Sequence, residues 1–289
     1  PKPLLRLLRS VQEQSLYPDA LLVVDGSTNS ETRIVLVENT FKNLTYFLVP
    51  KEYRGLTRQR NYGVDKASET SDMIAFVDDD TELTPNYFEE LVRTFVADKT
   101  IFGVGGVALN ENSWVLTEPN KQYNKYHFFQ FDKFVYKEGK RNVVRNYLRL
   151  QSNLEPGKMP DYSHGRTCGF PLDGNIYKVD LLIGMSFAFR KIVFDSIQFS
   201  SYFEGYGLYE DADFSIRALQ FGSNVINTKV QLNHYHDASG RPNQYQYGKM
   251  VVRNGWYVWR TKNPTPTFTH QFKWHSITIL LTLIRFSNI

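Results

Sequence analysis

The chain has 289 residues, 42% of them apolar, a length and composition that permit one large hydrophobic core or one domain with an appendage. Its net charge is +4, and its 34 Lys and Arg residues are spread along the chain, which excludes a dense nucleic-acid-binding arm and suits an anionic ligand or membrane surface. A single cysteine, Cys168, excludes an internal disulfide and a CxxC zinc site.

The first hundred residues alternate between helix and strand patterns. Leu4 to Gln14 has helical apolar spacing, and the apolar run Leu21 to Val24 stops at Asp25. This alternation predicts an α/β fold with a mostly parallel sheet, in which ligands bind beyond the carboxyl ends of the strands. We expect further helices at 31–42, at Thr57–Ser68 and from the N-cap Thr84 to Ala97, and further strands at Leu44–Val49, Met73–Val77 and Ile101–Leu109.

The pattern changes in the second half. Residues 110–180 are polar, aromatic and without clear period, so we expect an irregular insertion that shapes a pocket rather than a separate folded domain. Regular structure is expected again at Gly184–Phe189, in a helix at Glu210–Phe221 and in a strand at Val225–Leu232. A tail rich in tryptophan follows, and its longest apolar run is too short to span a bilayer.

Three consecutive carboxylates, Asp78, Asp79 and Asp80, follow the third predicted strand. Residues i and i+2 leave a strand on the same face, so Asp78 and Asp80 are expected to point into one site. Such oxygen ligands suit Mg²⁺ or Mn²⁺, which can also bridge a diphosphate. The alternative interpretation is a solvated acidic turn before a helix.

The pair Glu210 and Asp211 begins a predicted helix. Acidic residues in a first turn offset the helix dipole, and this explanation suffices for many such pairs. The functional interpretation is a general base that accepts a proton from a hydroxyl. His234 and His236 follow a later strand, and of the two we favour His236 as a metal ligand because it lies farther into the loop.

Arg58 and Arg60 open the helix that follows the second strand, where a guanidinium can hold phosphate through paired hydrogen bonds. A solvent-exposed helix face is the alternative for either residue. Asp25 could accept hydrogen bonds from a base or ribose, or could simply form a turn before Gly26.

Taken together, these residues resemble the inverting family 2 glycosyltransferases of the GT-A fold, which is the Rossmann-like fold of nucleotide-sugar transferases with helices flanking the sheet. The resemblance covers residues 1–240, the expected catalytic domain. Five segments carry it in the order of the family: Leu22–Ser27, Gly55–Gly63, Ile74–Asp80 (the DxD segment), Gly184–Lys191 and Tyr209–Arg217 (the ED segment).

The resemblance implies roles for individual residues. Asp25 and Arg60 would contact the nucleotide, Asp78 would lie near the ribose, and Asp80 would ligate the metal. Arg58 and Asp79 complete the residues expected around the donor, and Asp78 and His236 complete the expected metal ligands. Asp211 would be the base, with Glu210 supporting the acceptor. The family usually begins with a strand that is not seen before the first helix here, so donor contacts from that strand are not assigned.

The implied activity is metal-dependent transfer of a sugar from a nucleotide-diphosphate sugar to a glycan or lipid-linked acceptor, in surface polysaccharide or glycan synthesis. Two alternatives stay open: a sugar-phosphate nucleotidyltransferase and a non-catalytic sugar- or nucleotide-binding module. We expect a cytoplasmic protein without a nucleic-acid partner. For the tail at 241–289 we expect either contact with the inner face of the membrane or packing onto the catalytic domain.

Overall fold

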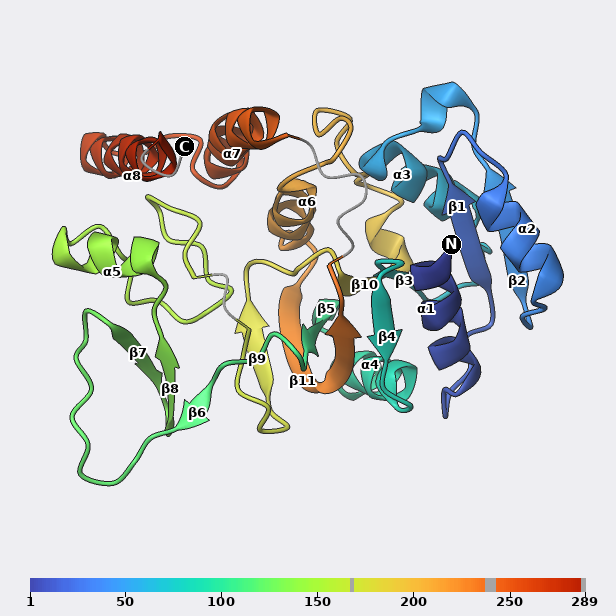
Figure 1. The fold of residues 1–289 in the computed structure, drawn as a ribbon, viewed down its shortest axis with the longest axis horizontal. Coiled ribbons are helices and arrows are strands. Elements are labelled where there is room, and N and C mark those ends of the chain that lie inside the picture. Colours follow the sequence, from blue (N-terminus) through green and yellow to red (C-terminus); the bar gives the residue numbers. More distant parts are fainter. Residues whose placement is uncertain (167–168, 237–242, 287–289) are drawn as a thin grey trace.

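The computed structural model describes residues 1–166, 169–236 and 243–286, so Cys168 lies outside the described residues. A central sheet with helices on both faces forms the middle of the molecule (Figure 1). The α/β class expected from the sequence is confirmed. The helices are α1 (Lys2–Gln12), α2 (Glu31–Glu38), α3 (Leu56–Lys66), α4 (Tyr87–Ala97), α5 (Lys140–Tyr147), α6 (Glu210–Ala218), α7 (Gln244–Lys262) and α8 (Phe268–Phe286), with short 3₁₀ turns η1 (Lys51–Tyr53) and η2 (Lys191–Val193).

The main sheet has six strands in the order β3-β10-β5-β11-β4, with β9 also paired to β11. Only β5 and β11 pair in parallel, and every other ladder in this sheet is antiparallel. The sheet is therefore more mixed than the expected, mostly parallel one, because β10 returns after the insertion and enters between β3 and β5. The strands are β3 (Met73–Val77), β4 (Thr81–Leu83), β5 (Ile101–Ala108), β9 (Ile176–Val179), β10 (Ser186–Arg190) and β11 (Ser223–His234).

Two smaller sheets flank the main one, at opposite ends of the molecule (Figure 1). β1 (Leu21–Asp25) and β2 (Leu44–Leu48) form a separate parallel pair. Within the insertion, β6 (Val115–Leu116), β8 (Phe134–Lys137) and β7 (Phe128–Phe131) form an antiparallel sheet. The expectation of an irregular segment at 110–180 is therefore wrong, because its strands and α5 are too short to give a readable period.

The start of α4 also differs from the prediction. The helix begins at Tyr87 with Asn86 as its N-cap, not at the expected N-cap Thr84. The backbone N–H and the hydroxyl of Thr84 both donate to the carbonyl of Gln231, at 3.1 and 2.9 Å. Thr84 thus extends the pairing between β4 and β11, and this delays the helix.

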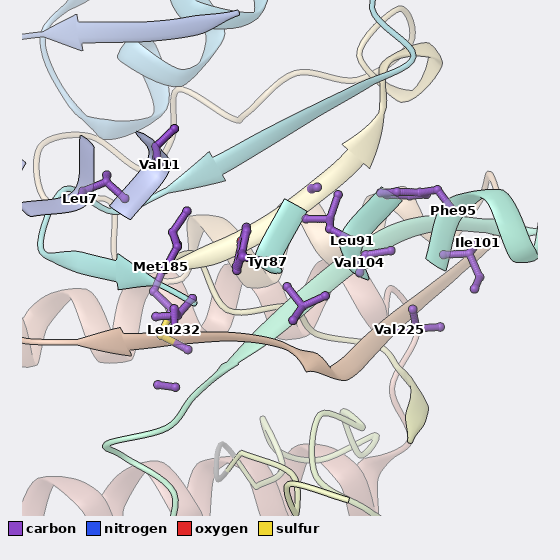
Figure 2. Close-up of a cluster of buried hydrophobic side chains, with 14 residues drawn as sticks. Leu7, Val11, Tyr87, Leu91, Phe95, Ile101, Val104, Met185, Val225 and Leu232 are labelled. Atoms are coloured by element: carbon purple, nitrogen blue, oxygen red, sulfur yellow. The ribbon is translucent and has the colours of Figure 1, made fainter. Parts of the chain in front are cut away.

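Apolar clusters lie on both faces of the main sheet. Side chains from α1 and α4 meet those of β5 and β11 in one cluster, labelled in Figure 2 from Leu7 to Leu232. On β10, Phe187 and Phe189 point to the opposite cluster, with Phe214 of α6, while Ala188 joins the first. The period of two along this strand thereby fixes α6 against the sheet face opposite α4.

The C-terminal helices pack onto α6 and the loop before it. Trp259 of α7 and Trp274 of α8 are buried and stacked, with ring centroids 4.7 Å apart. They join Ala212 of α6 and Phe203 in a third apolar cluster. Of the two interpretations of the tail, packing onto the rest of the chain therefore holds for the face of α7 and α8 that carries Trp259 and Trp274. Among the described residues, no helix is both long and apolar enough to cross a bilayer.

Candidate active site

The candidate site lies where three strands of the main sheet end. β5 is parallel to β11, and β3 runs in the same direction because both β3 and β5 are antiparallel to β10. The segments that follow them, Asp78–Asp80, Asn110–Glu111 and the end of β11 at His234, therefore meet at one edge. Asn110 fixes this junction: its amide donates to the carbonyl of His234 at 2.7 Å and accepts from its N–H at 3.0 Å.

Asp78, Asp80 and His234 each direct one ligand atom into a common cluster, with all three atoms within 4.8 Å of one another. The shortest approach joins His234 Nε2 and Asp80 Oδ1 at 3.3 Å. Asp79 is exposed and lies outside this cluster. The geometry follows the expected i, i+2 alternation, and two carboxylates with one imidazole form a donor set that suits a divalent cation.

The structure places His234, rather than the favoured His236, beside the DxD carboxylates. His234 Nδ1 lies 2.7 Å from Glu111 Oε1, and a proton held there leaves Nε2 free to face Asp80. Metal-bound histidines are commonly oriented by such a carboxylate on the second nitrogen. His236 contacts the same Glu111 oxygen at 2.8 Å and is 51% exposed. Glu111 is a residue that the sequence interpretation missed.

The pKa of Asp78 is raised to about 6, mainly by burial, and the nearby Arg60 opposes this rise. The Asp78 side chain keeps 39% of its surface open to solvent, which limits the effect of burial. Asp80 and His234 lie next to it and act in opposite directions on its pKa. A cation in the cluster would favour ionised Asp78, since opposite charge lowers the pKa of a carboxyl group.

Arg60 joins the metal-side cluster to the start of α6. Its guanidinium is buried, donates to Glu210 Oε1 and to the carbonyl of Gly184 at 3.2 Å, and lies 3.6 Å from Asp78 Oδ1. It also lies over the ring of Phe187, 4.8 Å from the centroid. The structure thus brings Arg60, Asp78 and Glu210 together, and the guanidinium of Arg60 is engaged by protein groups.

Glu210 is buried, and burial raises its pKa to about 8 against the opposing charge of Arg60. Gly184 leaves room for this pair, because a Cβ there would make tight contacts at 3.2 Å with both Glu210 Oε1 and Arg60 Nη2. The expected strand at 184–189 in fact begins at Ser186, so Gly184 precedes it as a point of close backbone approach.

Asp211 is held at the N-terminus of α6. Its Oδ2 accepts from the N–H of Gly184 at 2.9 Å, and its Oδ1 accepts from the N–H of Ala212 at 2.8 Å. A carboxylate fixed by two backbone donors has a defined direction and retains lone pairs for a further hydrogen bond. A carboxylate held in this way could accept a proton from a hydroxyl placed within hydrogen-bond reach.

Asp25 and Arg58, which were predicted to contact the donor, have other partners than the cluster at Asp78. At the end of β1, Asp25 accepts from the N–H of Ser27 at 2.7 Å and from the Tyr46 hydroxyl at 2.9 Å, and the pKa of Tyr46 is raised to about 12 by burial and by this bond. Arg58 pairs with Glu204 at 3.0 Å beside a cavity of about 160 Å³. In the described part of the chain, the hydrogen bonds of Asp25 and the ion pair of Arg58 do not include the cluster at Asp78.

The comparisons with known proteins concern the family and the fold. Residues 1–156 match the model of glycosyl transferase family 2. Over 115 residues the chain is 29% identical to the glucosyl-dolichyl phosphate glucuronosyltransferase of Haloferax volcanii, covering 39% of this chain and 34% of that protein. The chain therefore spans about a third of the length of this relative.

Two solved structures share the fold. One is GalNAc-T7 with UDP, GalNAc and Mn²⁺, at a TM-score of 0.53 and 14% identity, over 96% of this chain and 51% of that one. The other is S. aureus TarS 1–349, at a TM-score of 0.53 and 13% identity, over 99% of this chain and 68% of that one. At these identities the likeness establishes the fold alone.

The family match, on a chain with the GT-A fold, identifies a glycosyltransferase. Because the family model matches more than half of the chain, the chain belongs to glycosyl transferase family 2.

Proposed function

We propose that this chain transfers a sugar, with inversion, from a nucleotide-diphosphate sugar to an acceptor hydroxyl. One observation carries the proposal: Arg60 places the cluster of Asp78, Asp80 and His234 next to the helix start that holds Glu210 and Asp211. In single-displacement transfer the leaving group and the attacking hydroxyl lie on opposite faces of the sugar. A cation-binding cluster for the leaving group and a base for the hydroxyl must therefore border the same sugar site.

Asp80, Asp78 and His234 would hold Mg²⁺ or Mn²⁺, and the donor set and the orientation of His234 fit either ion. The bound ion would offset the charge of the leaving nucleoside diphosphate. UDP and Mn²⁺ are bound in the GalNAc-T7 structure, which supports the same donor class here. We further propose that Asp25, Arg58 and the exposed Asp79 line the path of the donor, with Asp78 near the ribose.

Asp211 accepts the proton of the acceptor hydroxyl as that oxygen attacks the anomeric carbon. The Gly184 N–H keeps its carboxylate in place, at 2.9 Å from Oδ2. Arg60 and Glu210 hold the metal-side cluster and α6 in register. Each of these groups acts through hydrogen bonds that are already formed, so little reorganisation is needed at the moment of reaction.

Product analysis with the variant Asp211→Asn tests this function. Release of a nucleoside diphosphate is expected from the wild type, with roughly a thousandfold lower turnover in Asp211→Asn, since general-base catalysis contributes on this scale. Release of pyrophosphate would instead support nucleotidyl transfer onto a sugar phosphate. Donor binding without turnover against any acceptor would support a binding module, and near-normal transfer by Asp211→Asn would refute the base assignment.

The acceptor is proposed to be a glycan or a lipid-linked sugar, since the Haloferax volcanii relative is named for a dolichyl phosphate substrate. We also propose that the exposed side of the C-terminal tail contacts an anionic membrane surface on the cytoplasmic side. Residues 238–289 contain seven Lys and Arg residues and no Asp or Glu. On α8, one narrow face is apolar and exposed, comprising Phe268, Phe272, Ile279 and Leu283.

Flotation with liposomes tests the membrane contact. Vesicles with an anionic lipid should carry the wild type at low salt and release it at high salt, while Phe272→Glu combined with Ile279→Glu should stay in solution. Val37→Glu is the matched control, because Val37 is an exposed apolar residue on the distant helix α2. Equal flotation of all three proteins, or of none, would contradict this part of the proposal.

A further inference from the structure

The turn before α6 is held in an unusual backbone conformation. Tyr209, the N-cap of α6, has φ 71° and ψ 12°, in the left-handed region that glycine favours. Glu210 and Asp211 follow it directly. Its carbonyl accepts the N–H of Asp213 at 3.1 Å, so the position of Tyr209 sets where α6 starts. A strained residue next to a proposed base calls for a group that holds it there.

His164, from the insertion, lies flat against the Tyr209 ring. The ring centroids are 4.7 Å apart and the planes differ by 10°. The edge of Trp274, from α8, meets His164 at 5.1 Å. Gly255, on α7, completes the enclosure, because a Cβ there would lie 3.0 Å from His164 Nε2. The imidazole is therefore enclosed by α6, α7 and α8.

This histidine is electrically neutral in the folded protein. Both ring nitrogens are shielded from solvent and lack a well-aligned partner among the described residues. Burial lowers the pKa of His164 to about 4, and the charge of Arg145 acts in the same direction, against a smaller opposing effect of the Gly255 backbone. Its contribution at neutral pH is therefore made by the ring face, not by a charge or a proton.

A second contact from α7 holds the same turn. The buried Asn254 donates its side-chain N–H to the carbonyl of Leu208 at 2.8 Å. The residue before Tyr209 and the ring of Tyr209 are thus both fixed by groups that the C-terminal helices support. This explains why a segment outside the region matched by the family model packs so closely on α6.

We propose that His164 is a positioning residue: by stacking on Tyr209 it transmits the packing of α7 and α8 to the turn that orients Asp211. This inference rests on the proposed function, in which Asp211 is the base. The insertion and the tail then serve the reaction through one aromatic stack.

Two substitutions at one position separate stacking from bulk. His164→Phe keeps a flat ring on Tyr209, and His164→Leu keeps apolar volume without the flat face. We expect His164→Leu to lower kcat about tenfold or more, as misplacement of a catalytic group does, with an unchanged KM for the donor and unchanged stabilisation by UDP with Mn²⁺. His164→Phe should recover kcat to within about threefold of the wild type on the same grounds.

Tyr209→Gly guards against a trivial loss of stability. Glycine relieves the left-handed strain while it removes the stacked ring, so the melting temperature should fall little. Turnover should nevertheless fall as in His164→Leu. Hydrogen exchange of the amides at 207–213 provides a readout without substrate: it should be faster in His164→Leu and in Tyr209→Gly, and restored in His164→Phe.

Two outcomes would overturn the proposal: unchanged kcat and exchange in His164→Leu, or an equal loss in His164→Phe and His164→Leu. Measuring Asp211→Asn in parallel separates this failure from that of the proposed function. An inactive Asp211→Asn with a fully active His164→Leu refutes the stacking role alone. An active Asp211→Asn refutes the assignment of Asp211 as the base. In that case, unchanged hydrogen exchange at 207–213 in His164→Leu would still refute the role of the stack.

Discussion

The two acidic groups at the sheet edge are built in contrasting ways. Around α6, Glu210 and Arg60 are buried and face each other, and both oxygens of Asp211 accept backbone N–H groups. Around the DxD segment, Asp78 keeps 39% of its surface open, and His234 presents Nε2 toward Asp80. The first arrangement is held together by contacts within the protein, although Glu210 Oε2 is buried without a hydrogen-bond partner among the described residues, and the second has ligand atoms that face a common point. This difference agrees with the proposal that the group at α6 defines geometry and the DxD group receives a cation.

Removing Arg60 should have the largest effect on stability. Above about pH 8, where the Glu210 carboxyl is ionised in the wild type, Arg60→Met removes its cation, and breaking such a pair costs about 3–5 kcal/mol. The matched control is Arg58→Met, which removes the exposed pair with Glu204 and should cost less than about 1 kcal/mol. Urea unfolding of both variants measures the contrast, and equal costs would show that the Arg60 pair is no more structural than a surface contact.

The metal-side cluster should respond to Mn²⁺ instead. At a concentration one hundred times its dissociation constant, a ligand of the folded state adds about 2.7 kcal/mol to the free energy of unfolding. Asp80→Asn and His234→Gln should each lose most of this gain, whereas His236→Gln should keep most of it. Urea unfolding with and without MnCl₂ tests this, and the reverse order of the two histidines would restore His236 as the ligand.

Gly184 lies between the two groups, and Gly184→Ala should disturb both. The added Cβ crowds Glu210 Oε1 and Arg60 Nη2, and overpacking of this kind costs roughly 1–3 kcal/mol. Turnover should fall together with stability, because the N–H of Gly184 also orients Asp211. Stability near that of the wild type would mean that the Arg60–Glu210 contact can relax without loss.

The pH dependence of stability should identify the buried carboxyl. The pKa of Glu210 is raised from its usual 4.5 to about 8, so the folded protein keeps a proton that the unfolded chain loses first. Its contribution is therefore complete below about pH 4.5 and is lost as the pH rises to about 8, at no more than about 1.4 kcal/mol per pH unit. Unfolding free energies across this range should fall more for the wild type than for Glu210→Gln, and parallel profiles would contradict the raised pKa.

Local sequence signals predicted the strand end at Asp78–Asp80 and the helix start at Glu210, because apolar runs and first-turn acids act over a few residues. The link between them was out of reach, since Arg60 and Glu210 are 150 residues apart in the chain. His234 and His236 could not be separated by their spacing alone. The approach of His234 to Asp80 distinguishes them, whereas Glu111 contacts both. Glu111 follows a strand whose carboxyl end had been predicted, so Asn110-Glu111 was the available signal for this residue.

The strand directions were also beyond the sequence. Ser186–Arg190 has the apolar character of a buried strand in either direction, and only the path of the insertion makes it antiparallel to both neighbours. The insertion itself is anchored by the buried pair of Arg166 and Glu138, with Nε and Oε1 2.8 Å apart. That pair joins residues 28 positions apart, which no helical or strand period connects.

The stacked tryptophans give the C-terminal helices an optical signature of their own. Three of the four tryptophans in the chain, Trp256, Trp259 and Trp274, lie on α7 and α8, with neighbouring centroids 5.0 and 4.7 Å apart. Indoles at this spacing couple their electronic transitions, so near-ultraviolet circular dichroism and fluorescence will report mainly on the union of these two helices. A change in tryptophan emission when a ligand is added therefore reports on the packing of α7 and α8 against α6. Binding at the strand ends that carry the carboxylates needs a separate probe.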